Sequence, residues 1–142
     1  LFVPSHGLTA LKLGADGKSF EQKWRSGRLR PGTASPLVHG QKVYSLNNAG
    51  VLACADVDSG NRLWQLRLDG PFGGSPVVAD NHMYIFSEEG LAQVVDLTAP
   101  EGNVVGKMDL GEMIQCSPAV SNGALFVRSN GHIWKISRKT RL

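Results

Sequence analysis

The sequence has little of what would indicate a membrane segment, a disulfide framework or a nucleic-acid partner. No stretch approaches the roughly 18 consecutive apolar residues that a membrane-spanning helix needs. Only two cysteines are present, and Cys54 and Cys116 fall at non-equivalent positions, so we expect two small buried thiols and no disulfide between them. Charged residues make up 19% of the chain and the net charge is +3, a modest value that does not indicate a nucleic-acid binder.

The chain is rich, by contrast, in residues that form turns. Its 142 residues include 17 glycines and 7 prolines, and 42% of them are hydrophobic. This is the composition of a globular domain. So many turn formers in a short chain favour many short strands over a few long helices. The chain opens on a strand-like segment without a signal peptide, and we interpret it as a fragment of a longer protein.

A short pattern, serine and proline followed by an apolar residue and valine, begins at Ser35, Ser75 and Ser117, which are 40 and 42 residues apart. Each copy precedes a polar turn, an apolar and aromatic segment, a glycine turn and a further apolar segment. Trp24 and Trp64 are also 40 residues apart and each closes a unit. A repeat of about 40 residues with four alternating strands is typical of propeller blades. We therefore predict an all-β fold, a partial β-propeller of about 3.5 four-stranded antiparallel blades from a seven- or eight-bladed parent.

The repeat divides residues 1–142, as a single partial propeller domain, into blade units of about 1–34, 35–74, 75–116 and 117–142. We expect the Ser-Pro strand to be innermost and the tryptophan strand outermost. The first unit then lacks its inner strand and the last unit lacks its outer strand, which leaves an open edge at each end. A homodimer closed around a twofold axis is one expected arrangement, and an open arc is the other.

One segment resembles the tryptophan-docking motif of the quinoprotein-like (PQQ-like) β-propeller repeat family, which runs Ala-x-Asp-x-x-Thr-Gly-x-x-x-Trp. Asp56, Gly60 and Trp64 match it, Ser59 stands for threonine and Cys54 replaces the leading alanine. The resemblance covers essentially the whole chain, which is also similar to the propeller of the outer-membrane barrel-assembly lipoprotein. The structural docking residues that the resemblance implies are Asp56, Ser59, Gly60, Trp64 and Trp24.

The third unit departs from this motif, because Gly106 stands where the tryptophan is expected. We therefore expect one blade junction to be weaker than the others. Trp134 lies on the third strand of its unit and is not a docking tryptophan by register. The resemblance also implies a bacterial protein in the periplasm, the cell envelope or the extracellular space.

The sequence carries no recognisable catalytic, cofactor-binding or metal-binding set. Quinoprotein dehydrogenases of this fold add an adjacent Cys-Cys ring, a calcium site and an aspartate base, and these are missing here. The acidic turn at Asp56 and Asp58 lacks the later ligands of a calcium loop. Residues 70–74 are glycine-rich but lead into a strand, so they lack the helix N-terminus of a phosphate-binding loop. We predict no enzyme and no cofactor for this chain.

We predict a non-catalytic module that binds or scaffolds a protein, since propeller loops vary freely on a rigid disc. The expected contact residues are Arg25, Arg28, Arg30 and Phe72, on interblade loops. The expected partners are a protein or a second copy of the chain, with no nucleic acid and no membrane span. Two alternatives stay open: part of a quinone-dependent dehydrogenase with ligands outside this chain, and a sensor domain of a kinase-like protein.

Overall fold

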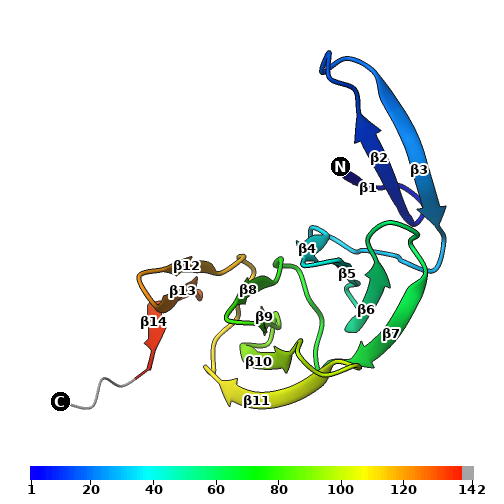
Figure 1. The fold of residues 1–142 in the computed structure, drawn as a ribbon. Helices are drawn as coiled ribbons and strands as arrows, with labels where there is room; N and C mark the ends of the chain where they lie inside the picture. Colours follow the sequence, from blue (N-terminus) through cyan, green and yellow to red (C-terminus); the bar gives the residue numbers. More distant parts are fainter. Residues whose placement is uncertain (139–142) are drawn as a thin grey trace.

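The computed structural model describes residues 1–138, which form fourteen β-strands and no helix. The strands make four antiparallel sheets, which we call blades 1 to 4 (Figure 1). Blade 1 consists of β1 (Phe2–Pro4), β2 (Leu8–Leu13) and β3 (Phe20–Ser26). Blade 2 consists of β4 (Leu37–His39), β5 (Lys42–Leu46), β6 (Val51–Asp56) and β7 (Arg62–Arg67).

Blade 3 consists of β8 (Val77–Ala79), β9 (His82–Phe86), β10 (Leu91–Asp96) and β11 (Asn103–Asp109). Blade 4 consists of β12 (Ala119–Ser121), β13 (Ala124–Arg128) and β14 (Ile133–Ser137). Within each blade every strand pairs with the next one along the chain. The prediction of a partial all-β propeller is therefore confirmed, with three strands in blades 1 and 4 and four in blades 2 and 3.

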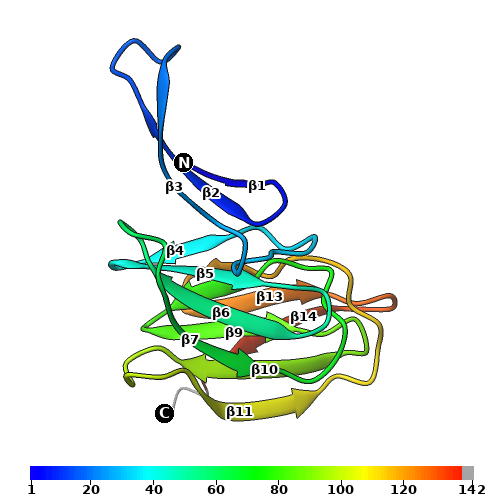
Figure 2. The ribbon, with the colours of Figure 1, turned by 90° about the vertical axis from the view of Figure 1, so that its right-hand side faces the viewer.

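The blades are arranged as a fan around their short inner strands, and the long outer strands β7 and β11 form its rim (Figures 1 and 2). Strands β8 and β12 of neighbouring blades contact each other at the inner edge. Serines connect the blades there. The backbone N–H of Ser35 donates to Oγ of Ser75 (2.9 Å), and the N–H of Ser75 donates to Oγ of Ser117 (2.8 Å). We call this chain of bonds the serine ladder.

The serine ladder explains why the inner strands start later than the repeat suggests. The sequence pattern predicts a strand from each serine, whereas β4, β8 and β12 begin two residues further on. The N–H groups of Ser35 and Ser75 bond to the next blade instead of to their own sheets, and in all three copies the following proline has no N–H to donate. The blade is thus attached to its neighbour before its own pairing begins.

The core lies between the blades, in three layers of side chains. Leu8, Trp24 and Val43 belong to the layer between blades 1 and 2, and Tyr44, Trp64 and Met83 to the layer between blades 2 and 3. Phe86, Ile114 and Val127 belong to the smaller layer between blades 3 and 4. Central strands are therefore apolar on both faces, as in β6, where four consecutive residues are buried.

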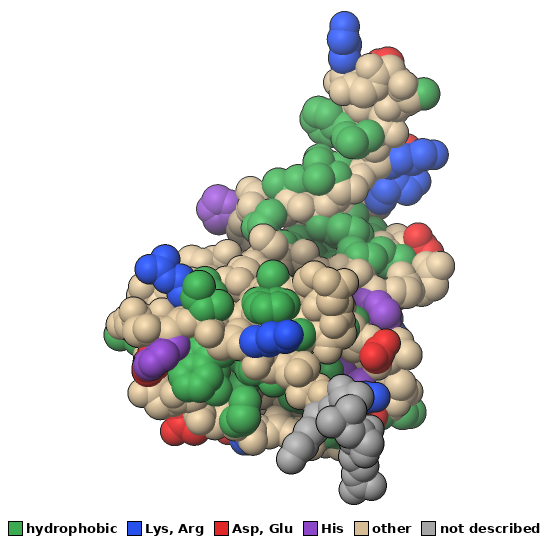
Figure 3. All heavy atoms as spheres, turned by 90° about the vertical axis from the view of Figure 1, so that its left-hand side faces the viewer, with side chains coloured by type: hydrophobic (Ala, Val, Ile, Leu, Met, Phe, Trp, Pro, Cys, Tyr) green, Lys and Arg blue, Asp and Glu red, His purple; other side chains and the backbone are tan. Residues whose placement is uncertain are grey.

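Both ends of the fan present open strand edges within residues 1–138. Strand β1 has no inner neighbour and β14 has no outer one. Ile133 on β14 is 77% exposed, and hydrophobic side chains are open to solvent on the side of the molecule that blade 4 occupies (Figure 3). No helix long and apolar enough to cross a membrane occurs in the described part of the chain.

Candidate binding surface

One side of the fan carries the segments that connect the blades, and we call it the loop face. Its turns follow β1, β5, β9 and β13, and each lies against an interblade segment. The N–H of Phe72 donates to the carbonyl of Asn48 (3.1 Å), and the N–H of Ile114 to that of Glu88 (3.2 Å). The N–H of Asn130 in turn donates to the carbonyl of Met113 (3.1 Å). These bonds hold the loops in place, so the loop face is a fixed surface.

Three recesses open where a turn meets an interblade segment. The first, of about 440 Å³, is lined by residues 4–7 together with Arg30 and Pro31. The second, of about 410 Å³, lies between Asn48 and residues 67–71. The third, of about 310 Å³, lies between Met113 and residues 128–130. The first two occupy equivalent places, each between a turn and the segment that leaves the same blade, so differences between them reflect differences in side chains. The third lies between the turn of blade 4 and the segment that enters that blade.

The first recess is cationic. Arg30 lines it, and Arg25 reaches its Ser5 from strand β3 and not from an interblade loop as predicted, while Arg28 is exposed on the segment between them. Among residues 1–138 no arginine forms an ion pair. The backbone holds two of these side chains in position: Nη2 of Arg25 donates to the carbonyl of Ser5 (3.2 Å) and Nε of Arg30 donates to that of Gly27 (2.8 Å). Their remaining guanidinium N–H groups can donate to a carboxylate.

Phe72, the fourth predicted contact residue, is not on this surface. Its side chain is fully buried in the layer between blades 2 and 3. The prediction that Phe72 contacts a partner from an interblade loop is therefore wrong. The loop backbone lies at the surface, but the ring turns inward because a phenyl group loses exposed apolar area by filling the space between two blades.

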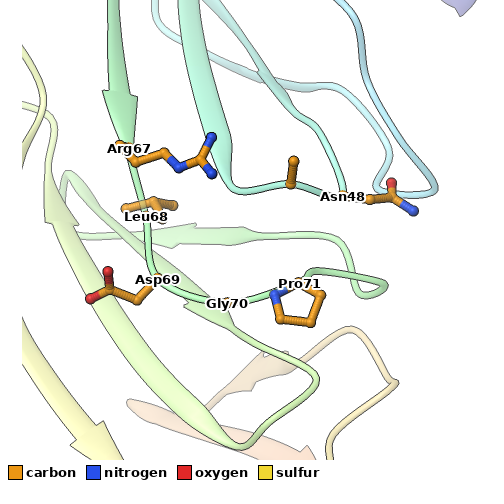
Figure 4. Close-up of a pocket in the computed structure, with 7 residues that line it drawn as sticks. Asn48, Arg67, Leu68, Asp69, Gly70 and Pro71 are labelled. Carbon is orange, nitrogen blue, oxygen red and sulfur yellow. The ribbon is translucent and has the colours of Figure 1, made fainter.

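The second recess differs in charge from the first (Figure 4). Arg67 and Asp69 flank it and point to opposite sides. Asp69 forms an ion pair with Lys107 of blade 3. The buried amide of Gln93 accepts from the N–H of Asp69 (3.0 Å) and donates to its carbonyl (2.9 Å). This recess is therefore bordered by a rigid connection between blades and, unlike the first, carries an acidic side chain.

The predicted docking tryptophans lie between blades. Trp24 of blade 1 packs on Gly60 of blade 2, where an added β-carbon would lie 2.5 Å from Cε3 of the indole. Its Nε1 donates to the carbonyl of Val57 (3.0 Å). Trp64 of blade 2 packs on Gly102 of blade 3 in the same way, with 2.5 Å to Cη2. Each glycine thus leaves the space that the preceding blade's indole fills.

The two tryptophans differ in their polar contact. Nε1 of Trp64 is buried and has no acceptor among the described residues. The turn from Asp96 to Gly102 is two residues longer than the turn from Asp56 to Gly60. The indole of Trp64 therefore contributes to the second junction by packing, while the polar contacts there come from Asp69, Gln93 and Lys107.

The turn that presents Gly60 is built by an aspartate. Oδ1 of Asp56 accepts from the N–H of Ser59 (2.8 Å) and from its hydroxyl (2.7 Å). These two bonds stabilise the carboxylate and lower the pKa of Asp56 below its usual value. The predicted residues Asp56, Ser59 and Gly60 are thus brought together in one turn, with Trp24 and not Trp64 as the ring that lies on it.

The third junction has no docking ring. Gly106 pairs with Val94, as Trp64 pairs with Cys54 and Trp24 with Ala10. An apolar hollow of about 200 Å³ lies beside Gly106, between blades 3 and 4.

Blade 4 is attached through a carboxylate instead. Glu112 accepts from the hydroxyl of Ser129 (2.5 Å) and the N–H of Gly131 (3.0 Å), and it contacts Nδ1 of His132 (2.5 Å). The hydroxyl of Ser129 also accepts from Nε1 of Trp134 (2.9 Å). The bonds from Ser129 and Gly131 are the main causes that lower the pKa of Glu112. Because the hydroxyl bonds to Glu112 and not to the imidazole, these three side chains do not have the order of a Ser-His-Asp triad.

The two cysteines differ in burial. Burial raises the pKa of the Cys54 thiol to about 11, so it is protonated at neutral pH. Cys116 is partly exposed, contrary to the expectation of two buried thiols. Its sulfur accepts a hydrogen bond from the backbone N–H of Arg128 (3.4 Å). Within residues 1–138 no three His, Cys, Asp or Glu side chains converge into a set that could hold a metal ion.

Sequence reasoning identified the tryptophans and Gly60, but missed that Trp24 of the preceding blade lies on Gly60 and that Gly102 receives Trp64. A signal was present, since Gly60 follows Trp24 by 36 residues and Gly102 follows Trp64 by 38. It also missed Glu112 and Gln93. Both act through contacts between blades that no spacing in the sequence reveals.

Comparison with known proteins relates this geometry to a family. The profile of the family described as outer membrane protein assembly factor BamB matches residues 14–105. The crystal structure of BamB from Moraxella catarrhalis is similar, with a TM-score of 0.72 and 21% sequence identity. The similarity covers 96% of this chain and 41% of that protein, so the chain spans less than half the length of this relative.

Two quinohemoprotein alcohol dehydrogenases are also similar in structure. ADHIIG from Pseudomonas putida HK5 has a TM-score of 0.59 and 16% identity, covering 69% of this chain and 16% of that protein. The enzyme from Comamonas testosteroni has a TM-score of 0.56 and 19% identity, covering 66% and 16%. At these identities the likeness shows the fold alone. No curated protein sequence matches the chain.

Proposed function

We propose, because the chain belongs to the family of the outer membrane protein assembly factor BamB, that it is a non-catalytic propeller module that binds or scaffolds another protein. The observation that carries the proposal is the cationic recess of the loop face. Arg25 and Arg30 are each bonded there to a backbone carbonyl, Arg28 is exposed between them, and none of the three has an acidic partner among the described residues. The proposal includes a bacterial periplasmic, cell-envelope or extracellular location.

The recess favours a partner segment that carries carboxylates. An exposed ion pair contributes about 0.2–1 kcal/mol, so a single arginine would select a partner poorly. Arg30 at the recess of about 440 Å³, with Arg25 beside its Ser5 and Arg28 close in sequence, can act on the same acidic segment, and bidentate hydrogen bonds add direction to the attraction. Glu88 and Glu89 lie in the corresponding turn of blade 3, so the acidic segment is expected at the blade 1 side of the loop face.

Charge reversal tests the proposal. The variant Arg25→Glu/Arg28→Glu/Arg30→Glu is compared with Lys12→Glu/Lys18→Glu/Arg62→Glu, which changes the net charge equally at exposed positions elsewhere. Binding of a short fluorescein-labelled glutamate-rich peptide is measured by anisotropy at about 0.15 M salt. We expect the affinity of the first variant to fall about tenfold and that of the control to change little.

Equal weakening of both variants would show attraction by net charge alone, and no weakening of the arginine variant would remove the recess from the proposal. Unchanged circular dichroism spectra verify that both variants fold. Association of two copies through the open edges stays a prediction, which sedimentation velocity at high concentration tests. The alternative, part of a quinone-dependent dehydrogenase, requires ligands outside this chain, and dye reduction by the full-length protein with quinone and calcium tests it.

A further inference from the structure

The apolar hollow between blades 3 and 4 is the feature that the proposed function leaves unused. Gly106 and Met108 of β11 form one wall, and Leu125 and Ile136 of blade 4 form the other. Its volume of about 200 Å³ exceeds the roughly 150 Å³ of a dry cavity that can hold a benzene ring. Met108 at its margin is 45% exposed, so the hollow can be entered from solvent.

The register shows what kind of group fits this place. Trp24, Trp64 and Gly106 occupy the same position in successive outer strands, each opposite the third strand of its blade and each at a bulge. In the first two junctions an indole fills the space between the blades and is 8% and 7% exposed. The hollow beside Gly106 is the corresponding space without its ring.

The chain has no tryptophan of its own to place there. It contains three; Trp24 and Trp64 fill their own junctions, and Trp134 is bonded through Nε1 to Ser129. A second copy of the chain has its tryptophans engaged in the same way. An indole that enters the hollow therefore comes from outside these 142 residues.

We propose that the hollow is a binding site for one tryptophan side chain presented by a partner polypeptide. The walls are apolar, which suits the body of the ring, and methionine at the margin adapts its shape and makes favourable sulfur–aromatic contacts. This site lies on the rim, apart from the arginine recess, and does not rest on the function proposed for that recess.

Titration with N-acetyl-L-tryptophanamide, followed by backbone amide NMR of the full chain, tests the site. We expect saturable shifts at Val94, Gly106 and Leu125 with a dissociation constant on the order of 1 mM, as suits a small ligand. N-acetyl-L-leucinamide, which lacks the ring, is expected to bind at least tenfold more weakly. The variant Arg25→Glu/Arg28→Glu/Arg30→Glu is expected to bind the probe unchanged, so the two sites fail or succeed separately.

The variant Gly106→Trp places an indole in the hollow from β11 itself. It is expected to abolish the amide shifts that the tryptophan probe causes. An added β-carbon at Gly106 lies 3.7 Å from Cγ2 of Val94, an ordinary contact, so the residue can be accommodated. The control Val105→Trp places the same residue on the neighbouring position, which is 51% exposed, and should leave binding intact. Met108→Lys, at the exposed margin of the hollow, should weaken binding of the probe at least threefold. This second variant tests the site without filling the hollow.

Absence of shifts in the wild-type chain would overturn the proposal. Shifts that persist in Gly106→Trp, or equal binding of the leucine probe, would also overturn it.

Discussion

The first two blade junctions and the third one solve the same structural problem in different ways. Between blades 1 and 2 and between blades 2 and 3, an indole from one blade lies on a glycine of the next. Between blades 3 and 4 the indole is replaced by Gly106, and Glu112 connects the blades through hydrogen bonds. The fold thus tolerates the loss of its repeated packing residue where a charged group forms another connection.

The comparison indicates which junctions are stabilised mainly by burial and which by polar contacts. Burial of an aromatic side chain removes about 150–250 Å² of surface from water. The stabilisation that this burial gives changes little with salt or pH. A carboxylate with hydrogen-bond donors is sensitive to both. The third junction should therefore open first, and under different conditions from the other two.

The largest effect is expected from removing an indole. Trp64→Ala should reduce the free energy of unfolding by about 3–5 kcal/mol, because it leaves a cavity between blades 2 and 3. Trp134→Ala, at the third junction, should cost about 1–2 kcal/mol since this side chain is only partly buried. Urea denaturation followed by tryptophan fluorescence and circular dichroism measures both. Equal losses would remove the distinction between the junctions.

A smaller effect is expected from filling the space that an indole needs. A β-carbon at Gly102 would lie 2.5 Å from Cη2 of Trp64, whereas one at Gly106 would have ordinary contacts. Gly102→Ala should therefore cost about 1–3 kcal/mol, while Gly106→Ala should stay within about 0.5 kcal/mol of the wild type. Thermal unfolding of the two variants side by side decides the matter, and a neutral Gly102→Ala would contradict the tight packing described here.

The smallest effect concerns Glu112 and depends on pH. Its hydrogen bonds lower the pKa of the carboxyl group below the usual value of 4.5. The carboxylate therefore stabilises the folded chain above pH 4.5, and this contribution is lost as the pH falls through the lowered pKa. Wild type should be more stable than Glu112→Gln at pH 7, and the difference should shrink toward pH 3.

Glu101→Gln, in an exposed turn, is the matched control for Glu112→Gln and should show no such trend. Chemical denaturation at several pH values gives the required free energies. A difference between wild type and Glu112→Gln that grew as the pH fell would have the wrong sign and would contradict the proposed role of the carboxylate.

The fold was predictable because the same residues recur at the same positions in successive units. The serines at 35, 75 and 117 and the tryptophans at 24 and 64 identify the blades and the order of strands within them. Contacts between blades were less predictable. Phe72 was placed on the surface because its neighbours are glycines and proline, yet turn composition determines the path of the backbone and not the side to which a ring points. Glu112 and Gln93 act on partners 17–24 residues away, where no periodicity marks the pair.

The serine ladder gives the arc a polarity. Each rung has a backbone donor on one blade and a hydroxyl acceptor on the following one, so two identical ends cannot join through it. Any further blade, from the same polypeptide or another, can extend the ladder only head to tail. Because the same bond joins each pair of blades, the serine ladder does not determine how many blades a ring contains. The number that closes a ring must be set by the angle between neighbouring sheets, and hence by the bulk of the side chains, indole or none, at each junction.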